Sequence, residues 1–421
     1  MARSSSRPAR AKRPGNHRGL KVFLVALVVL LVLLVLNAFA LNNETKPASL
    51  NVPGATLVST TSGDLQVLDT GPAPNADPNK PDPLPIVLVH GSASAINWWN
   101  ELIPLLSPTH RVIAVDMLGY GGSNKPDSGY SMENQANIIT QALAKLDVAQ
   151  AVLVGHSLGG EVVTAMAEQS PGLVAGVTII DDAPDLSYGG LGGTAALARA
   201  PILGQAIWRL SPRFMLKKSL SQAFAPGYDV PTEFVDDIKD MTYTAYKKSY
   251  EEGDSYTKEE PLDQRLQALD KPLLIMFGEE DQIFNARESI SAYAAIPGVK
   301  TVLIPGSGHS PQVEKPKEAA AAILDFTNAL DKELLPPPVI PKKDKKNGKN
   351  QNGKSGKSNK NGSNNQSGNG KNGNAAKNTN QTSDSGNKSG VGPTSQASRK
   401  SAQNEPKHQA KNQTDTAGKS N

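Results

Sequence analysis

Residues 151–160 read Ala-Val-Leu-Val-Gly-His-Ser-Leu-Gly-Gly, an apolar run of strand length that leads directly into a Gly-x-Ser-x-Gly pattern. The following residues, 160–168, have the composition of a helix. A strand, a tight turn and a helix in this order place a serine hydroxyl on an exposed elbow. Glycines are required around such a turn because the serine backbone is strained and neighbouring side chains would collide with the flanking elements. The pattern therefore predicts that Ser157 is a catalytic nucleophile and not a structural serine.

A histidine is expected to act as the base, because a serine hydroxyl is a poor nucleophile near neutral pH and imidazole has a suitable pKa. The middle of the chain offers His90, His110, His156 and His309. His309 stands in a glycine-rich loop after the last predicted strand, and its position fits the chain order Ser, acid, His that belongs to such an elbow. We expect His110 to be a core or capping residue and His156 to point away from the serine. The predicted base is His309.

The acid of the predicted triad must lie between the serine and the histidine, at the end of a strand. Asp281 follows the apolar run 273–277 and is our choice, with Glu280 as the alternative. Its role is to hold the imidazole tautomer and to stabilise the imidazolium. The oxyanion hole needs backbone N–H donors, which we assign to Leu158, the residue after the nucleophile, and to Ser92.

The middle of the chain shows an α/β pattern, in which short apolar runs alternate with stretches of helical periodicity. Runs that are nearly continuous in Val, Ile and Leu are typical of strands buried on both faces. The expected central strands are 86–90, 112–115, 151–155, 177–180, 273–277 and 301–304. A helical stripe is expected at 138–146, and a closing helix at 319–330.

Two further features complete the expected body. Residues 56–62 and 65–70 predict an antiparallel hairpin that turns at Gly63-Asp64. Residues 186–262 carry aromatic residues and methionines at irregular helical spacing and contain no convincing strand. Because a loop of that length without structure would be unusual, we expect an inserted helical cap there.

The charge distribution separates an acidic body from two basic ends. Residues 1–21 contain seven Lys or Arg and no acid, and residues 341–421 contain 16 Lys or Arg and 4 acids. Removing these ends, +7 and +12, from the net charge of +4 leaves 22–340 at −15. An acidic body argues against nucleic acid as a partner. The chain has no cysteine, which excludes disulfides, thiolate catalysis and Cys-ligated metals.

The N-terminal apolar segment predicts a membrane helix. Every residue from Val22 to Leu36 is Val, Leu, Ala or Phe, and the apolar stretch continues to Leu41 with one interruption. This length spans a bilayer, and the basic flank on its N-terminal side keeps 1–20 in the cytoplasm and sends the rest out. The alternative is a secretory signal peptide, cleaved after Ala38-Phe39-Ala40, which would release the protein. Both interpretations place the catalytic body outside the cytoplasm.

The expected organisation is therefore a basic segment at 1–20, a transmembrane helix or signal peptide at 21–41, a hydrolase-like domain at 42–335 and a tail at 336–421. The tail consists mainly of Lys, Asn, Gly, Ser and Gln, and such a composition predicts disorder. It either makes a weak electrostatic contact with anionic envelope polymer or lipid, or is a solvated tail with no specific partner.

The chain from about 54 to 334 resembles the α/β-hydrolase superfamily, and within it the capped serine hydrolases that include esterases, carbon-carbon bond hydrolases and cofactor-free haloperoxidases. The motifs that carry the resemblance are His-Gly-Ser at 90–92, Asp-Met-Leu-Gly-Tyr-Gly-Gly-Ser at 116–123, the elbow, Gly-Glu-Glu-Asp at 278–281, and Gly-His at 308–309 followed by Glu-Lys-Pro at 314–316. The resemblance implies a mostly parallel sheet flanked by helices, with a helical cap. In the family the Asp116 motif forms a turn and is structural. Related dehalogenases and epoxide hydrolases carry aspartate at the nucleophile position, so Ser157 argues against both.

Three functions follow as hypotheses. The first is hydrolysis of a small or medium carboxylic ester through Ser157, His309 and Asp281, with no cofactor and no metal. The second uses the same triad for carbon-carbon bond hydrolysis or perhydrolysis. The third, from a different class, is a non-catalytic envelope binding protein on a hydrolase scaffold, because fold alone does not guarantee chemistry.

Overall fold

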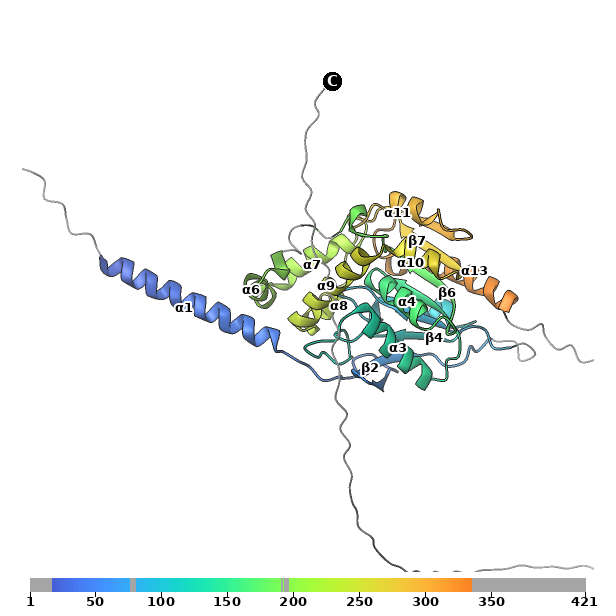
Figure 1. Cartoon of the computed structure of the whole chain (residues 1–421), viewed down its shortest axis with the longest axis horizontal. Coiled ribbons are helices and arrows are strands. Elements are labelled where there is room, and N and C mark those ends of the chain that lie inside the picture. The colour runs from blue at the N-terminus through green and yellow to red at the C-terminus, as the bar shows by residue number, and fades with distance from the viewer. Residues whose placement is uncertain (1–16, 76–80, 191, 193–196, 335–421) are drawn as a thin grey trace, which may run out of the picture. The chain divides into compact units, whose positions relative to one another are not determined.

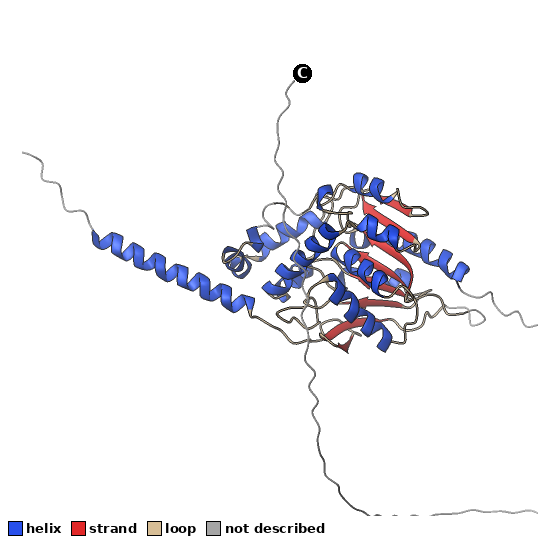
Figure 2. Cartoon of the chain, in the orientation of Figure 1, coloured by secondary structure: helices blue, strands red, loops and turns tan. Residues whose placement is uncertain are grey.

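The computed structural model describes residues 17–75, 81–190, 192 and 197–334. The predicted tail at 336–421 and most of the basic segment at 1–20 lie outside the described residues. Figure 1 shows the chain from helix α1 (His17–Asn42) to helix α13 (Pro316–Leu334), and Figure 2 shows strands that lie side by side with helices around them.

The centre of the fold is an eight-stranded sheet with the order β1-β2-β4-β3-β5-β6-β7-β8. Its strands are β1 (Thr56–Thr60), β2 (Gly63–Asp69), β3 (Ile86–Val89), β4 (Val112–Val115), β5 (Ala151–His156), β6 (Val174–Ile180), β7 (Leu273–Gly278) and β8 (Lys300–Ile304). Strand β2 pairs antiparallel with both neighbours, whereas β4, β3 and β5 to β8 run parallel. The predicted central strands are confirmed, with ends shifted by at most a few residues.

Helices cover both faces of this sheet, which explains why its strands are apolar on both sides. Val87 and Val89 point into one core, and Ile86 and Leu88 point into the other, as the two-residue period of a strand requires. The first core includes residues of α3 (Met132–Lys145), α4 (Leu158–Gln169) and α11 (Ala286–Tyr293). The second includes residues of η1 (Ile96–Trp99), α2 (Ile103–Leu106) and α13.

The hairpin turn lies two residues earlier than predicted. Thr60 pairs with Gly63, so Thr61 and Ser62 form the turn, and Gly63 already belongs to β2. Gly63 has a φ of +130°. A side chain there would approach Asn124, whose amide oxygen accepts the Asp64 N–H at 2.7 Å. The loop that contains Asn124 therefore fixes the start of β2, and this long-range contact cannot be predicted from the hairpin sequence.

Between β6 and β7 the described residues are helical, as expected for a cap. The elements there are η2 (Leu186–Tyr188), α6 (Leu203–Leu210), α7 (Arg213–Leu220), η3 (Ser221–Ala223), α8 (Thr232–Asp240), α9 (Tyr243–Glu259) and α10 (Leu262–Ala268). Helix α10 begins where the predicted cap ends, and its Leu262 and Leu266 are buried in the first core. Helix α12 (Pro311–Glu314) and α13 follow the last strand.

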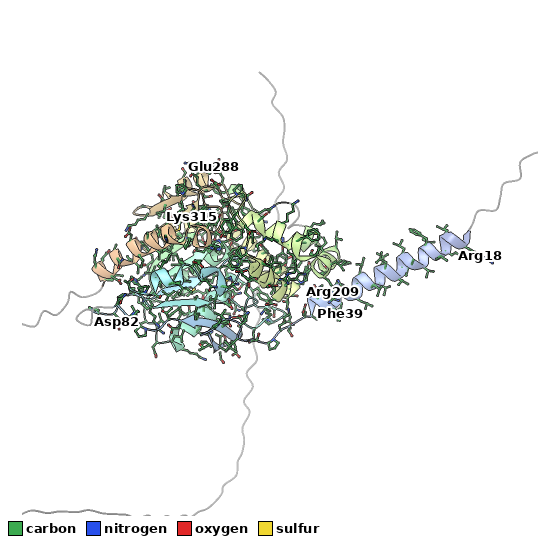
Figure 3. All side chains as sticks on the ribbon, turned by 180° about the vertical axis from the view of Figure 1, so that it is seen from behind. Arg18, Phe39, Asp82, Arg209, Glu288 and Lys315 are labelled. Carbon is green, nitrogen blue, oxygen red and sulfur yellow. The ribbon has the colours of Figure 1, made fainter. Side chains whose placement is uncertain are left out.

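Helix α1 is the one helix, among the described residues, that is long and apolar enough to cross a membrane. Figure 3 shows side chains projecting all along α1 between Arg18 and Phe39, and most of its apolar side chains are exposed. A membrane anchor and a signal sequence both satisfy this description.

Candidate active site

Ser157 occupies the turn between β5 and α4 and has the strained backbone that an elbow requires. Its φ is +49° and its ψ is −129°, outside the regions that L-residues normally occupy. Its N–H donates to the Ile180 carbonyl at 2.8 Å, which ties the turn to β6. A side chain on Gly155 would collide with the Gly159 carbonyl, and one on Gly159 with the Val89 carbonyl. The two glycines are thus required by close backbone contacts on either side of the serine.

His309 and Asp281 form a hydrogen-bonded pair at the carboxyl edge of the sheet. His309 Nδ1 donates to Asp281 Oδ2 at 2.9 Å, and both side chains are buried. The other carboxylate oxygen, Oδ1, accepts the N–H groups of Ile283 at 2.7 Å and Phe284 at 3.2 Å. These donors fix the orientation of the carboxylate. His309 is therefore held with Nδ1 protonated and Nε2 available as a base.

Glu280, the alternative acid, is exposed and forms no hydrogen bond with His309 in the described part of the chain. The backbone explains this difference. The Glu280 N–H donates to the Ser307 carbonyl at 2.8 Å, and the Asp281 N–H turns back to the Gly278 carbonyl at 3.3 Å. This turn directs the two neighbouring side chains differently, and only Asp281 reaches the imidazole.

Ser157 and His309 line the same cavity, although no hydrogen bond joins Ser157 Oγ to a histidine within the described residues. Such contacts are often long in a free enzyme and shorten when substrate binds. The histidine and the acid are therefore in direct contact. The serine lines the same cavity as the histidine but does not contact it through a hydrogen bond.

His156 and Glu314 hold the loop that carries His309, a role that sequence reasoning missed. His156 Nε2 lies 2.7 Å from the His309 carbonyl, and the pKa of His156 is lowered well below its ordinary value by burial and by the nearby His309. Glu314 accepts the N–H groups of Gly308 at 3.0 Å and Ala225 at 2.7 Å. The Glu-Lys-Pro motif was the sequence signal, because its acid lies five residues after the histidine.

The other two candidate histidines, His110 and His90, are structural. His110 lies 3.1 Å from Asp331 of α13, which agrees with the expected core or capping role. His90 is completely buried, and burial lowers its pKa. Its neutral ring contacts the Gly91 carbonyl through Nδ1 at 2.8 Å and accepts the Met117 N–H through Nε2 at 3.1 Å.

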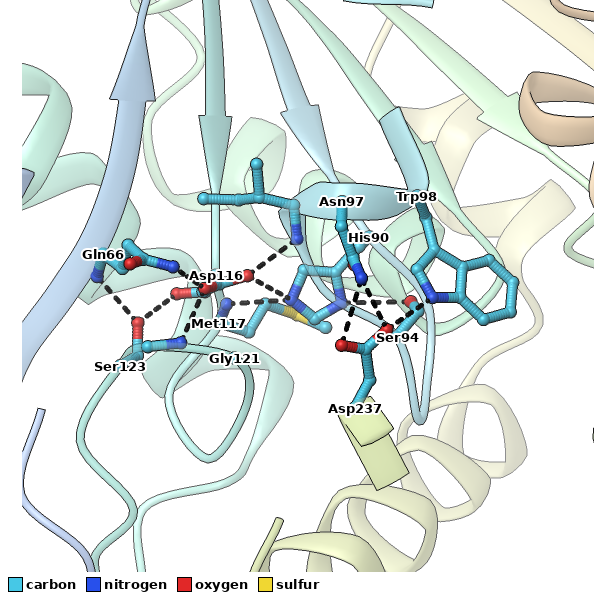
Figure 4. A network of polar contacts seen from close by, with 12 residues as sticks. Gln66, His90, Ser94, Asn97, Trp98, Asp116, Met117, Gly121, Ser123 and Asp237 are labelled. Atoms are coloured by element: carbon cyan, nitrogen blue, oxygen red, sulfur yellow. Dashed lines mark hydrogen bonds and ion pairs between the residues drawn. The ribbon is translucent and has the colours of Figure 1, made fainter. Parts of the chain in front are cut away.

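A polar network beneath the His90 loop gives the Asp116 motif its structural role (Figure 4). Asp116 accepts the N–H groups of Ile96 and Gly122, each at 2.8 Å, and the Gln66 side-chain amide at 2.6 Å. These bonds fix the turn at 116–123 and the start of η1 relative to β2. The interpretation of Asp116 as turn-forming therefore agrees with its contacts.

The predicted oxyanion donors lie at the start of α4 and in the loop after β3. Leu158 is the first residue of α4, and the N–H groups at a helix start have no partner within the helix. Neither the Leu158 N–H nor the Ser92 N–H has a hydrogen-bond acceptor in the ranges the structure describes. Ser92 lines the cavity together with Leu158. Both amides are thus free to bind a developing negative charge.

Asp181 is a further acid beside the predicted triad, and sequence reasoning overlooked it. One ligand atom from each of Asp181, Asp281 and His309 lies within 4.8 Å of the others. Burial, together with the nearby Asp281, raises the pKa of Asp181 well above its ordinary value. Two carboxylates and an imidazole could hold a divalent cation. Because the Gly278 N–H binds Asp181 at 2.9 Å and His309 binds Asp281 at 2.9 Å, the cluster fits hydrogen-bonded side chains better than an ion site.

The cavity has a volume of about 650 Å³, within the range of small-molecule sites. Part of its wall is apolar and comes from η1 and the cap helices α6 to α8, including Trp98, Ile207 and Leu216. Another part is polar and includes Glu161 of α4, Asp182 after β6 and Asp254 of α9. The cavity therefore has an apolar wall and an acidic wall in addition to the proposed triad residues.

Comparisons with known proteins agree with this architecture. A family model for the alpha/beta hydrolase fold matches residues 85–316. An uncharacterised protein of Mycobacterium tuberculosis is 31% identical over 255 residues, which cover 55% of this chain and 71% of that protein. The 2-hydroxymuconate semialdehyde hydrolase of a Pseudomonas species is 26% identical over 263 residues, 59% of this chain and 88% of that enzyme. An esterase structure from Exiguobacterium antarcticum shares the fold with a TM-score of 0.54 at 20% identity, over 65% of this chain and 99% of that one.

Proposed function

The chain belongs to the α/β-hydrolase family and is an esterase-like hydrolase, and from this premise we propose that it hydrolyses small or medium carboxylic esters through an acyl-enzyme on Ser157. The observation that carries the proposal is the bond between His309 and Asp281, made at the wall of the cavity that Ser157 also lines. A scaffold without catalysis has no need of this arrangement.

In the proposed reaction the Ser157 hydroxyl oxygen attacks the carbonyl carbon of the ester, and its proton passes to His309 Nε2. The carbonyl oxygen becomes an oxyanion that accepts the N–H groups of Leu158 and Ser92. Asp281 stays ionised and stabilises the imidazolium through Nδ1–H. Collapse of the intermediate breaks the bond to the alcohol oxygen, which takes the proton from His309 as the alcohol leaves.

Deacylation repeats these steps with water as the nucleophile. His309 removes a proton from water, the hydroxyl oxygen attacks the acyl carbon, and the bond to Ser157 Oγ breaks. The serine recovers its proton from His309, and the carboxylic acid is released. Every proton is exchanged between named groups, so the proposed reaction needs no cofactor.

A carbon-carbon bond hydrolase or perhydrolase with the same triad is the alternative within enzymes. The name of the Pseudomonas relative favours the first of these. The two reactions differ from ester cleavage in the substrate that fills the cavity and not in the three residues proposed to act.

The proposal is tested with purified full-length protein in detergent and a panel of p-nitrophenyl esters of increasing acyl length. We expect hydrolysis of short and medium esters, and a loss of kcat/KM by about 10⁴-fold or more in Ser157→Ala and in His309→Ala. Hydrolysis at the wild-type rate by either variant would contradict the proposal. Inactivity of the wild type toward every ester, with turnover of a vinylogous diketone, would favour the carbon-carbon alternative.

We further propose that α1 is retained as a membrane anchor and that the catalytic body faces away from the cytoplasm. The basic flank lies wholly on the N-terminal side of the apolar segment. The end of α1 contacts the cap, where Gln205 Nε2 donates to Asn42 Oδ1 at 2.9 Å. Leu210 of α6 and Phe214 of α7, exposed by 76% and 73%, add apolar surface to the cap. This combination suits a protein held at a lipid surface.

The basic tail from Lys342 onward is proposed as a second, weaker contact with anionic lipid or envelope polymer. Each Lys near an anionic surface contributes on the order of 1 kcal/mol, and salt screens this attraction. The tail is not required for the reaction, because all the residues proposed to act lie between Ser92 and His309.

A further inference from the structure

We infer that Glu161 and Asp182 form a subsite for a cationic group of the substrate, so that the preferred esters carry an ammonium group. The inference rests on the proposed ester hydrolysis and names its substrate class. It is carried by the positions and missing partners of two buried acids in the wall of the cavity that contains Ser157.

Both acids are buried and incompletely paired. Glu161 and Asp182 are 8% and 3% exposed, and Glu161 Oε2 and Asp182 Oδ2 have no hydrogen-bond partner among the described residues. A buried carboxyl oxygen without a partner costs stability, so such groups are normally paired in proteins. Glu161 and Asp182 both line this cavity and lie close to each other. A ligand that donates hydrogen bonds or carries positive charge supplies the missing partner.

The position of Glu161 places this subsite beside the reacting atoms. Glu161 lies one helical turn after Ser157 on α4, and Leu158, the proposed oxyanion donor, lies between them. Asp182 follows β6, whose Ile180 carbonyl binds the Ser157 N–H. A substrate whose carbonyl carbon sits at Ser157 Oγ therefore has its acyl or alcohol part within reach of both acids.

Two nearby arginines are already paired with other acids, whereas Lys218, which also lines the cavity, is exposed to solvent. Arg199 binds Asp254 at 3.1 Å and lies over the Tyr250 ring, 5.1 Å from its centroid. Arg265 binds Glu168 at 3.0 Å and is stacked on the Tyr256 ring. No basic side chain among the described residues pairs with Glu161 or Asp182. The local charge therefore favours a cation over an anion or an apolar group.

Burial, followed by the influence of Asp254, raises the pKa of Glu161 to about 8, and burial together with Glu161 raises that of Asp182 well above its ordinary value. These shifts favour the protonated forms of both acids when no cation is bound. A bound ammonium group would favour their ionised form, as an opposite charge within a few ångströms does. Without a bound cation, Glu161 and Asp182 therefore need not be two unpaired buried charges.

Two glycines keep the space around these carboxyl groups open. A side-chain carbon on Gly253 would lie 2.6 Å from Glu161 Oε2, and one on Gly160 would lie 2.7 Å from Asp182 Oδ2. Gly253 is inside α9, where glycine destabilises a helix relative to alanine. This cost is explained if the carboxyl group of Glu161 needs the room.

The inference is tested with two esters of equal shape, 3-(dimethylamino)propyl butyrate and 4-methylpentyl butyrate, in which a protonated nitrogen replaces a CH group. For the full-length protein in detergent we expect kcat/KM to be higher for the ammonium ester by about tenfold or more, the value of one charge-assisted hydrogen bond. In Glu161→Gln and in Asp182→Asn we expect this ratio to fall toward one, with hydrolysis of the alkyl ester retained.

Glu251→Gln is the matched control, because Glu251 lies on α9 but is partly exposed, pairs with Lys247 and does not line the cavity. We expect it to keep the preference of the wild type. Equal kcat/KM for the two esters in the wild type, or a preference that survives both cavity variants, would overturn the inference. Failure to hydrolyse either ester would instead count against the proposed function, so the two failures are distinguishable.

Discussion

Asp281 and Asp181 differ in their hydrogen-bond partners, and this difference assigns them different roles. Asp281 accepts two backbone N–H groups on one oxygen and the His309 Nδ1–H on the other, which fixes it against the imidazole. Asp181 has one backbone donor, and its other oxygen has no hydrogen-bond partner among the described residues, so that it makes no hydrogen bond to His309. Only the first is expected to stabilise the imidazolium directly.

The corresponding prediction compares two isosteric changes. Asp281→Asn should lower kcat by about 10³- to 10⁴-fold, because an amide at this position stabilises the wrong imidazole tautomer. Asp181→Asn should lower kcat by less than about tenfold, because Asp181 makes no hydrogen bond to His309 and the amide oxygen can still accept the Gly278 N–H. Steady-state kinetics on one p-nitrophenyl ester measures both values. Equal losses in the two variants would show that Asp181 shares the role of the triad acid.

At the scale of the elements, the elbow depends on close contact between β5 and α4. Gly155→Ala should destabilise the folded protein by more than about 2 kcal/mol, because the new methyl group meets the Gly159 backbone, which cannot move away without distorting the helix start. Gly172→Ala is the control, since nothing lies within 4 Å of a side-chain carbon there. Its effect should stay within about 0.5 kcal/mol. Thermal denaturation compares the two variants, and similar melting temperatures would contradict the packing described.

Helix α4 also supplies a prediction about pH and stability. The pKa of Glu161 is about 8 in the folded protein and near its ordinary value of 4.5 when the chain unfolds. The folded state therefore binds the proton more tightly, and Glu161 progressively destabilises the fold as the pH rises from 4.5 to about 8. Glu161→Gln should remove this pH-dependent loss of folding stability.

Thermal unfolding across this pH range tests whether Glu161 destabilises the folded protein as the pH rises. The Tm of Glu161→Gln should exceed that of the wild type by at least about 3 °C near pH 9, with a smaller gap at acidic pH. The Glu251→Gln control should show no such growing gap, because the pKa of Glu251 is lowered by its lysine partners despite partial burial. A constant difference between Glu161→Gln and wild type would mean that Glu161 is ionised throughout.

The elements could be predicted from sequence where the physical signal is local. The buried strands are continuous in apolar residues, and the Ser157 elbow follows from two glycines and its flanking strand and helix. The turn at Thr61-Ser62 was misplaced because Asn124, distant in sequence, fixes the start of β2. Asp181 and His156 were likewise missed, since their roles arise from contacts across the sheet edge that no spacing in the sequence indicates.

At the scale of the whole molecule, the apolar length of α1 and the one-sided basic flank predict an integral membrane protein. High salt should leave the full-length chain in the membrane fraction, whereas detergent should release it, because insertion is hydrophobic and the tail contact is electrostatic. The mature N-terminus should be Met1 or Ala2. Soluble protein that begins at Leu41 would instead show that α1 is a cleaved signal sequence.

Deletion of the basic tail distinguishes the enzyme hypothesis from the binding-protein hypothesis. If the basic tail were the functional part, deletion of 336–421 would abolish retention at the cell envelope, and the protein would hydrolyse no ester. We expect instead that this deletion leaves kcat/KM toward a soluble ester within about twofold, since the proposed reaction uses only the hydrolase domain. Assays of the deletion variant in detergent measure this directly.

Covalent labelling with a fluorophosphonate tests the assignment of Ser157 as nucleophile most directly, because the reagent reacts with a serine only where a base and an oxyanion hole activate it. Intact-mass and peptide analysis of the native full-length protein should show one adduct, located on Ser157, and neither Ser157→Ala nor the heat-denatured wild type should be labelled. Labelling that persists in Ser157→Ala, or an adduct on another serine, would contradict the assignment.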